Sequence, residues 1–197
     1  GGAEARAGYQ AILKGAPASP EALEGLGLVA LREKQPDQTL PMLARAVETG
    51  AAGARACLAY ARVEPDRDKA LAALERAAKL NPRWAEPHFE MARREIDPAL
   101  RVQRLAAAAK REPRNSGYWQ TLAEAQEAAS QFTDAAKSWA AAEMAAPSPD
   151  ERRRLQDIRR QAEVRRLDEA EAEKKRKAEE GRREIEALKQ RSAASIQ

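Results

Sequence analysis

The sequence predicts an all-α fold in which pairs of helices stack side by side. Prolines recur at Pro17, Pro82, Pro113 and Pro147, and the last two are 34 residues apart. An interval of this length is typical of repeated helix-turn-helix units. No β-branched run and no alternation of apolar and polar residues indicates a strand. We therefore expect a helical solenoid in place of a single globular core.

The composition of the 197 residues suits a thin core between neighbouring repeats. Charged residues make up 34% of the chain and aromatic residues only 4%. Few large apolar side chains are therefore available to fill one compact core. A solenoid needs less, because each repeat buries only the layer that it shares with its neighbours. Alanine side chains at those layers let the helices approach closely.

The charge distribution argues against nucleic acid as a partner. The formal net charge is +4, and residues 148–197 carry 15 basic and 12 acidic side chains. Neither this stretch nor the rest of the chain has the strongly basic surface of a nucleic-acid-binding protein. No stretch of 18 apolar residues is present, so the sequence predicts no membrane span.

Helical repeats are predicted throughout residues 1–147. The predicted units are a half repeat at 3–17 and full repeats at 18–51, 52–82, 83–113 and 114–147. In the first full repeat, Ser19 is a candidate N-cap directly before Pro20. The two middle repeats are shorter, with deletions at the turns around Pro65 and Pro98. We expect shorter first helices in these two repeats.

Matched residues identify the repeat type. The last repeat carries Trp119, Leu122, Ala123, Ala135, Trp139, Ala142 and Pro147, and the first full repeat carries Leu23, Leu26, Gly27, Leu43 and Ala46. At this spacing the pattern resembles the tetratricopeptide repeat (TPR), over residues 3–147. The resemblance implies a right-handed α-α superhelix whose first helices line a concave face. It also implies that Gly27 lies at a close helix crossing.

Five positions depart from the pattern of that family. Thr39 and Arg101 take places where alanine is usual, and Glu64, Glu95 and Gln126 replace a usual tyrosine. These departures predict looser packing, above all in the repeat 83–113.

Residues 148–197 form a different kind of segment. Ser148 and Glu151 have the spacing of a capping box, which predicts a helix that begins at Pro149. Leu155, Ile158 and Ala162 form one apolar stripe, suited to covering the exposed end of the last repeat. The sequence therefore predicts a capping helix that extends into a long charged helix.

Three states of the charged part of this helix are open. Glutamates four residues before a basic residue, at 171 and 175, 173 and 177, and 179 and 183, favour a solitary solvated helix. A heptad through Val164, Leu167, Ile185 and Leu188 allows a coiled coil, although polar residues and Gly181 occupy half of the seam. Fraying is the third state. We expect a monomer, with self-association through this helix as the alternative.

Residue types for catalysis, metals and cofactors are scarce. The chain has one histidine, His88, and one cysteine, Cys57, and both occupy inward positions of the repeat, so we expect packing roles for them. A zinc site needs about four ligands. Gly25 and Gly27 follow no predicted strand and so do not indicate a phosphate loop. We predict no catalytic residue, no metal, no cofactor and no enzymatic activity.

The family resemblance implies a partner-binding groove on the first helices. Transferring the groove positions to this sequence gives the candidate residues Leu28, Leu58, Arg62, Phe89, Arg93, Gln120 and Glu124. The leucines and Phe89 would form an apolar floor, and Arg62 and Arg93 would hold an acidic group in bidentate fashion. The competing interpretation is that both arginines are solvated or are paired with Glu86 and Glu90.

The sequence thus predicts a non-catalytic interaction module that binds a protein or peptide partner, with the long helix as a spacer or tether. Two alternatives are a regulatory segment of a larger enzyme and an oligomeric scaffold assembled through the long helix. The chain begins Gly1-Gly2 without a methionine, so we expect a fragment or a processed chain, and no compartment is predicted.

Overall fold

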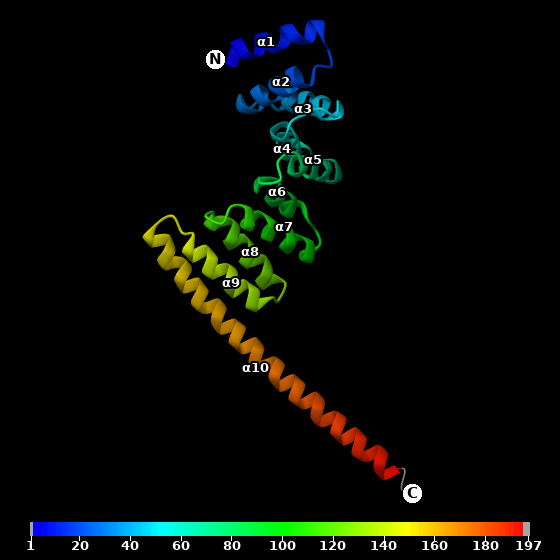
Figure 1. Ribbon diagram of the computed structural model, residues 1–197, viewed down its shortest axis with the longest axis vertical. Coiled ribbons are helices and arrows are strands. Elements are labelled where there is room, and N and C mark those ends of the chain that lie inside the picture. Colours follow the sequence, from blue (N-terminus) through cyan, green and yellow to red (C-terminus); the bar gives the residue numbers. More distant parts are fainter. Residues whose placement is uncertain (1, 195–197) are drawn as a thin grey trace. The chain divides into compact units, whose positions relative to one another are not determined.

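The computed structural model describes residues 2–194, and the side chains of residues 2–189, as a succession of α-helices without strands (Figure 1). The helices are α1 (Gly2–Gly15), α2 (Pro20–Arg32), α3 (Pro36–Glu48), α4 (Ala54–Val63), α5 (Arg67–Leu80), α6 (Glu86–Arg94), α7 (Pro98–Arg111), α8 (Ser116–Ala128), α9 (Phe132–Met144) and α10 (Pro149–Ala194). The prediction of an all-α repeat fold followed by a long C-terminal helix is confirmed. Residues 1 and 195–197, at the outer ends of the predicted ranges 1–147 and 148–197, lie outside the described residues.

The chain divides into two compact units, between Pro113 and Arg114. The first unit contains α1 to α7 and the second contains α8 to α10. This division follows compactness, whereas the predicted boundary between 147 and 148 follows the change in sequence pattern. That predicted boundary stays a prediction about how the chain is organised.

In the first unit each helix packs against the next one along the chain, as Figure 1 shows for α1 to α7. The predicted ranges 18–51, 52–82 and 83–113 each contain one helix pair. Leu23, Leu43 and Leu74 are completely buried between the helices, together with many alanines. Because alanine has a small side chain, this core is a succession of close helix contacts.

Gly27 marks one such contact. A Cβ atom at this position would lie 2.6 Å from Cγ and Cδ2 of Leu43 on α3. No side chain fits at that distance, so the absence of a Cβ lets α2 and α3 meet there. The close crossing that the sequence predicts at Gly27 is therefore present.

The middle repeats have the shorter first helices that their deletions predict. Helix α4 has 10 residues and α6 has nine, whereas α2 and α8 have 13 each. The second helix of each middle repeat begins at an aspartate N-cap. The side chain of Asp66 accepts hydrogen bonds from the backbone N–H groups of Asp68 and Lys69, and that of Asp97 from those of Ala99 and Leu100. Such caps satisfy backbone donors that a helix start leaves open.

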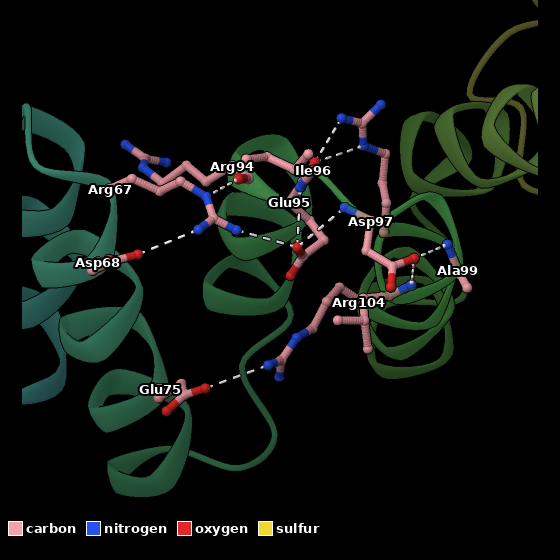
Figure 2. Close-up of polar contacts among 11 residues, drawn as sticks. Arg67, Asp68, Glu75, Arg94, Glu95, Ile96, Asp97, Ala99 and Arg104 are labelled. Carbon is pink, nitrogen blue, oxygen red and sulfur yellow. Dashed lines mark hydrogen bonds and ion pairs between the residues drawn. The ribbon is translucent and has the colours of Figure 1, made fainter.

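Polar contacts occupy the positions that depart from the TPR pattern. Figure 2 shows Arg67 of α5 reaching the turn before α7, where its Nη2 lies 3.2 Å from Oε1 of Glu95. The same carboxylate oxygen accepts a hydrogen bond of 3.0 Å from the backbone N–H of Ile96. Arg101 donates to the backbone carbonyl of Glu95 at 2.6 Å. The turn is thus held by ionic hydrogen bonds where a tyrosine and an alanine are usual.

The other departures are also hydrogen-bonded. Thr39 is buried, and its hydroxyl donates to the carbonyl of Gln35 at 2.8 Å. Gln126 is buried, and its side-chain oxygen accepts from the hydroxyl of Ser138 at 2.7 Å. A buried polar group is costly only when it lacks such a partner. These substitutions therefore need not loosen the repeats in which they occur.

The second unit is a three-helix arrangement in which α9 packs against both α8 and α10. Leu155 and Ala162 of α10 are buried in a cluster with Trp139, and Ile158 and Trp119 pack against that cluster. The indole N–H of Trp139 donates to Glu127 at 3.0 Å. The apolar stripe at the start of α10 thus covers α9, as its sequence predicts.

Helix α10 begins as the sequence predicts, but only half of the capping box forms. The hydroxyl of Ser148 accepts from the backbone N–H of Glu151 at 3.2 Å. The carboxylate of Glu151 does not return to Ser148. It accepts instead from Ser116 at 3.3 Å and from Gln120 at 3.1 Å, both on α8. The second half of the predicted box is therefore replaced by a tertiary contact.

Beyond its contact with α9, the surface of α10 consists mostly of charged side chains that are exposed to solvent. Two predicted pairs are present, with Lys175 2.7 Å from Glu171 and Lys177 2.6 Å from Glu173. The third, between residues 179 and 183, is not formed within 4.0 Å, although the structure describes both side chains. The heptad residues Val164, Leu167, Ile185 and Leu188 are each more than half exposed.

Candidate partner-binding surface

Three arginines surround one buried carboxylate on the first helices of the middle repeats. Glu90 of α6 has a side chain that is 6% exposed, and it accepts from Nε of Arg62 on α4 at 3.0 Å. Arg94 reaches the other oxygen of Glu90 at 3.0 Å, and Arg93 lies 3.7 Å from it. Arg62 also bonds to Glu86. These five residues are called the Glu90 cluster below.

Repeat geometry explains why the cluster forms. Glu90 lies on the first helix of its repeat, as Arg62 does on the first helix of the preceding repeat, and the long side chain of Arg62 reaches from one helix to the other. Arg94 strengthens this link, since its Nη2 donates to the backbone carbonyl of Ala61 on α4 at 2.7 Å. One ionic network therefore connects two neighbouring repeats.

The cluster carries more positive than negative charge. Burial opposes ionisation of Glu90, but hydrogen bonds from Arg62 and Arg94 outweigh it and lower the pKa of this carboxyl. Burial likewise opposes the charge on Arg62, and its bonds to Glu86 and Glu90 raise the pKa of the guanidinium. Three guanidinium groups thus face two carboxylates. A polar pocket of about 450 Å³ is lined by Glu90 and the three arginines.

The structure brings the two predicted arginines, Arg62 and Arg93, together at Glu90, but their contacts differ. Arg62 is engaged with both of the glutamates named in the competing interpretation. The side chain of Arg93 is 64% exposed, and it makes one long contact to Glu90. Arg93 is consequently the member with donors directed to solvent.

The predicted apolar floor is less continuous than expected. Leu58 is 4% exposed and belongs to the core of the first unit, so it offers little surface to a partner. Leu28 packs against the same core and is half-buried. Phe89 is also half-buried, next to Glu90 in the sequence.

The last two predicted residues lie in the second unit. Gln120 of α8 donates to Ser116 at 2.8 Å and to Glu151 at 3.1 Å, so it connects α8 to the start of α10. Glu124 is exposed on the same helix. The assignment of all seven residues to one binding site stays a prediction.

A second pocket, which sequence reasoning missed, lies among α5, α6 and α7. It has a volume of about 600 Å³ and is lined by Glu75, Ala78, Lys79, Pro82, His88, Met91, Arg104 and Arg111. The sequence places His88 at a packing position, and the ring is half-buried. However, its two ring nitrogens are buried without a hydrogen-bond partner. Burial, Arg111 and Arg104 together lower the pKa of His88 to about 4.

Comparison with known proteins bears on the fold. No protein-family model matches the sequence, and no curated protein does. Among solved structures, YrrB, described as a TPR protein with an unusual peptide-binding site, is 17% identical with a TM-score of 0.66, over 79% of this chain and 84% of that one. A crystal structure of MamA is 20% identical with a TM-score of 0.61, over 70% of this chain and 84% of that one.

The chain has the tetratricopeptide-repeat fold. PilF of Pseudomonas aeruginosa gives the same result, at 15% identity and a TM-score of 0.62, over 85% of this chain and 82% of that one. Identities this low establish the TPR fold alone.

No metal-ligand group is assembled in the described part of this chain. Residues 2–189 contain no group of three or more His, Cys, Asp or Glu side chains that could hold a metal ion. Cys57 is completely buried, and burial raises the pKa of its thiol. No helix in the described residues is both long and apolar enough to cross a membrane.

Proposed function

We propose that this chain is a non-catalytic interaction module whose first helices bind a peptide or protein partner, with an acidic group of the partner held at the Glu90 cluster. The TPR fold supports the general role. The observation that carries the specific proposal is the surplus of one guanidinium over the two carboxylates in the cluster.

Arg93 is the residue that meets the partner. Arg62 and Arg94 are occupied by carboxylates and, for Arg94, by a backbone carbonyl of α4. Arg93 has only the contact of 3.7 Å to Glu90 and is 64% exposed. A guanidinium fork binds a carboxylate through two parallel hydrogen bonds, so Arg93 suits an Asp or Glu side chain or a terminal carboxylate.

The apolar part of the partner lies beside this charge. Leu28 and Phe89 are half-buried, so each combines a fixed position with some accessible surface. Fixed apolar anchors cost little conformational entropy on binding. The module therefore favours a segment that combines an acidic group with apolar residues.

Helix α10 is proposed as a spacer. In this proposal residues 1–147 bind the partner, and residues 148–197 provide the spacing. The 46 residues of the helix correspond to roughly 70 Å at 1.5 Å per residue. Only its first turns are buried against α9. The rest separates whatever is bound to the repeats from whatever is attached to the helix.

A peptide selected on this chain from a displayed random library provides the test. Its affinity is measured by fluorescence anisotropy for the unaltered chain, for Arg93→Ala and for Arg153→Ala. Arg153 is the matched control, because it is 81% exposed on α10 and pairs weakly with Asp150. We expect Arg93→Ala to lower the affinity by about tenfold, as for the loss of one charge-assisted contact, and Arg153→Ala to leave it unchanged.

The peptide is then made with amides in place of its carboxylates. This form should bind the unaltered chain as weakly as the acidic form binds Arg93→Ala. Equal affinity of the three proteins for the acidic peptide would remove Arg93 from the proposal.

The exposed apolar residues of α10 favour a second candidate function, an oligomeric scaffold. Val164, Leu167, Ile185 and Leu188 lie on the heptad positions and are each more than half exposed. Light scattering over a range of protein concentrations separates the two functions. The scaffold function predicts that the apparent molar mass doubles as the protein concentration rises. It also predicts that Leu188→Ala abolishes this increase.

A further inference from the structure

We propose that the pocket among α5, α6 and α7 is a second ligand site, which binds a dianionic phosphate group carried on an apolar body. This pocket is separate from the Glu90 cluster, since no residue lines both. The proposal stands on three observations of the residues that line it.

The first observation is unsatisfied polar chemistry. Both ring nitrogens of His88 are buried and have no hydrogen-bond partner. Buried polar atoms of native proteins nearly always have partners, and an exception calls for an explanation. A neutral imidazole carries one N–H donor, and a shift of the His88 ring toward the pocket that it lines would bring this donor to a ligand oxygen.

The second observation is charge. Lys79, Arg104 and Arg111 line the pocket with one carboxylate, that of Glu75, so two positive charges remain. His88 adds none at neutral pH, because burial and the two arginines keep its pKa low. A phosphate monoester carries a charge close to −2 at pH 7, whereas a carboxylate carries −1. The balance of the pocket thus matches a phosphate monoester better than a carboxylate.

The arginines of this second observation also have N–H donors that a phosphate group could use. Arg111 gives Nε to the carbonyl of Pro82 at 2.7 Å and Nη1 to that of Ala107 at 2.8 Å, which fixes the guanidinium and leaves N–H groups of Nη2 for a ligand. Arg104 makes one long contact, 3.4 Å, to Glu75. Figure 2 shows Arg104 extended from α7 toward Glu75 on α5. A phosphate dianion competes well for such a weakly held guanidinium.

The third observation is an apolar wall. Ala78, which is half-buried, and Pro82, which is exposed, contribute apolar surface to the lining, whereas Met91 in the same lining is almost fully buried. An inorganic phosphate would leave this wall uncovered, whereas an aromatic or alkyl phosphate would cover it. The ligand class is therefore an organic phosphate monoester, and the probe that represents it is phenyl phosphate.

The test uses the full chain, in which His88 is the only histidine and gives a single set of imidazole signals in a proton NMR spectrum. Phenyl phosphate, inorganic phosphate, phenylacetate and phenol are titrated separately at pH 7. We expect a saturable shift of the His88 signals with phenyl phosphate, weaker binding of phosphate and of phenylacetate, and none of phenol. Equal affinity for phenylacetate and phenyl phosphate would overturn the dianion assignment, and the absence of any saturable shift would overturn the site.

Two variants should change the affinity for phenyl phosphate in opposite directions, and a third serves as the control. Arg104→Gln should weaken phenyl phosphate binding by about tenfold, and Glu75→Gln should strengthen it several-fold by removing the competing carboxylate. Lys110→Gln is the control, because Lys110 is exposed on α7 outside the pocket lining. Thermal melting of each variant establishes that it is folded. Identical affinity of Arg104→Gln, Glu75→Gln and the unaltered chain would contradict the proposal.

Discussion

The carboxylate of Glu90 accepts a hydrogen bond of 3.0 Å from Nε of Arg62, which lies on the first helix of the preceding repeat. The two side chains differ in exposure, at 6% for Glu90 and 42% for Arg62. The contact therefore joins a buried group of one repeat to a surface group of its neighbour. The same residues stabilise the stack and border the proposed partner site, so the stability of the stack and partner binding share one network.

Replacing Glu90 tests the structural side of this relationship. We expect Glu90→Gln to lower the free energy of unfolding by roughly 1–3 kcal/mol, because the amide cannot hold two guanidinium groups as the carboxylate does. Glu86→Gln is the matched control on the same helix, since Glu86 bonds to the same arginine but is 34% exposed. It should cost less than about 1 kcal/mol, as exposed ion pairs do. Urea denaturation followed by circular dichroism measures both, and equal losses would contradict the assigned role of Glu90.

The same substitution at two glycines should have opposite effects. In Gly27→Ala the new methyl group overlaps Leu43, and we expect a loss of about 1–3 kcal/mol from overpacking. In Gly181→Ala the methyl group meets nothing within 4 Å, so helix propensity alone should stabilise α10 by roughly 0.5–1 kcal/mol. Thermal melting and helix content report the two changes. A stabilising Gly27→Ala would show that α2 and α3 are not in close contact.

The contact between α10 and α9 should depend on Leu155. This side chain is fully buried, so we expect Leu155→Ala to cost about 2–5 kcal/mol through the lost contacts and the cavity. Leu188, at 64% exposed, provides the control, and Leu188→Ala should change stability by less than about 0.5 kcal/mol. Chemical denaturation of the two variants under the same conditions gives the comparison. A similar small effect for both would mean that α10 does not cap the second unit.

His88 should titrate well below the usual range for histidine. Its pKa is lowered to about 4 by burial and by Arg111 and Arg104, and the remaining charged groups of its pocket are Lys79 and Glu75. Between pH 6.5 and 4 the unfolded chain therefore binds a proton that the folded chain does not. Stability should fall as the pH falls through this window, by on the order of 2 kcal/mol from this group.

The histidine titration is measured directly from the single His88 ring signals. The midpoint should lie near pH 4 in the folded chain and near pH 6.5 in the chain unfolded in urea. Replacing His88 with leucine should reduce the loss of stability in this window. A folded midpoint near 6.5 would place the ring in solvent instead of in the pocket.

Much of the fold follows from the sequence because helix packing imposes a period on it. The spacing of Trp139, Ala142 and Pro147 reflects a helix that packs and then ends, and Gly27 reflects a close crossing. The apolar stripe from Leu155 to Ala162 likewise indicates its own burial. Such features are local in the sequence, and the structure confirms each of them.

The candidate site is harder to predict because it depends on contacts between repeats. The position of Arg62 predicts that it faces a groove, and pairing with Glu90, 28 residues away, is only one of the interpretations that the sequence leaves open; the structure shows the two side chains at hydrogen-bond distance. Leu58 is assigned to the same groove, yet neighbouring helices bury it. The second pocket combines residues of three helices, and the only signal for it in the sequence is that His88 is polar at a packing position.

The alanine-rich helix contacts of both units have a consequence for how this chain tolerates mutation. Most of its buried apolar positions hold alanine, which has little left to remove. Truncation, the usual way to damage a protein interior, therefore has few targets, which are mainly the buried leucines, Val29, Tyr60, Met91 and Trp139. Enlargement is the general hazard, because one added methylene at such a position pushes apart two helices at once. Random variants of this chain should accordingly fail mainly where small residues become larger ones.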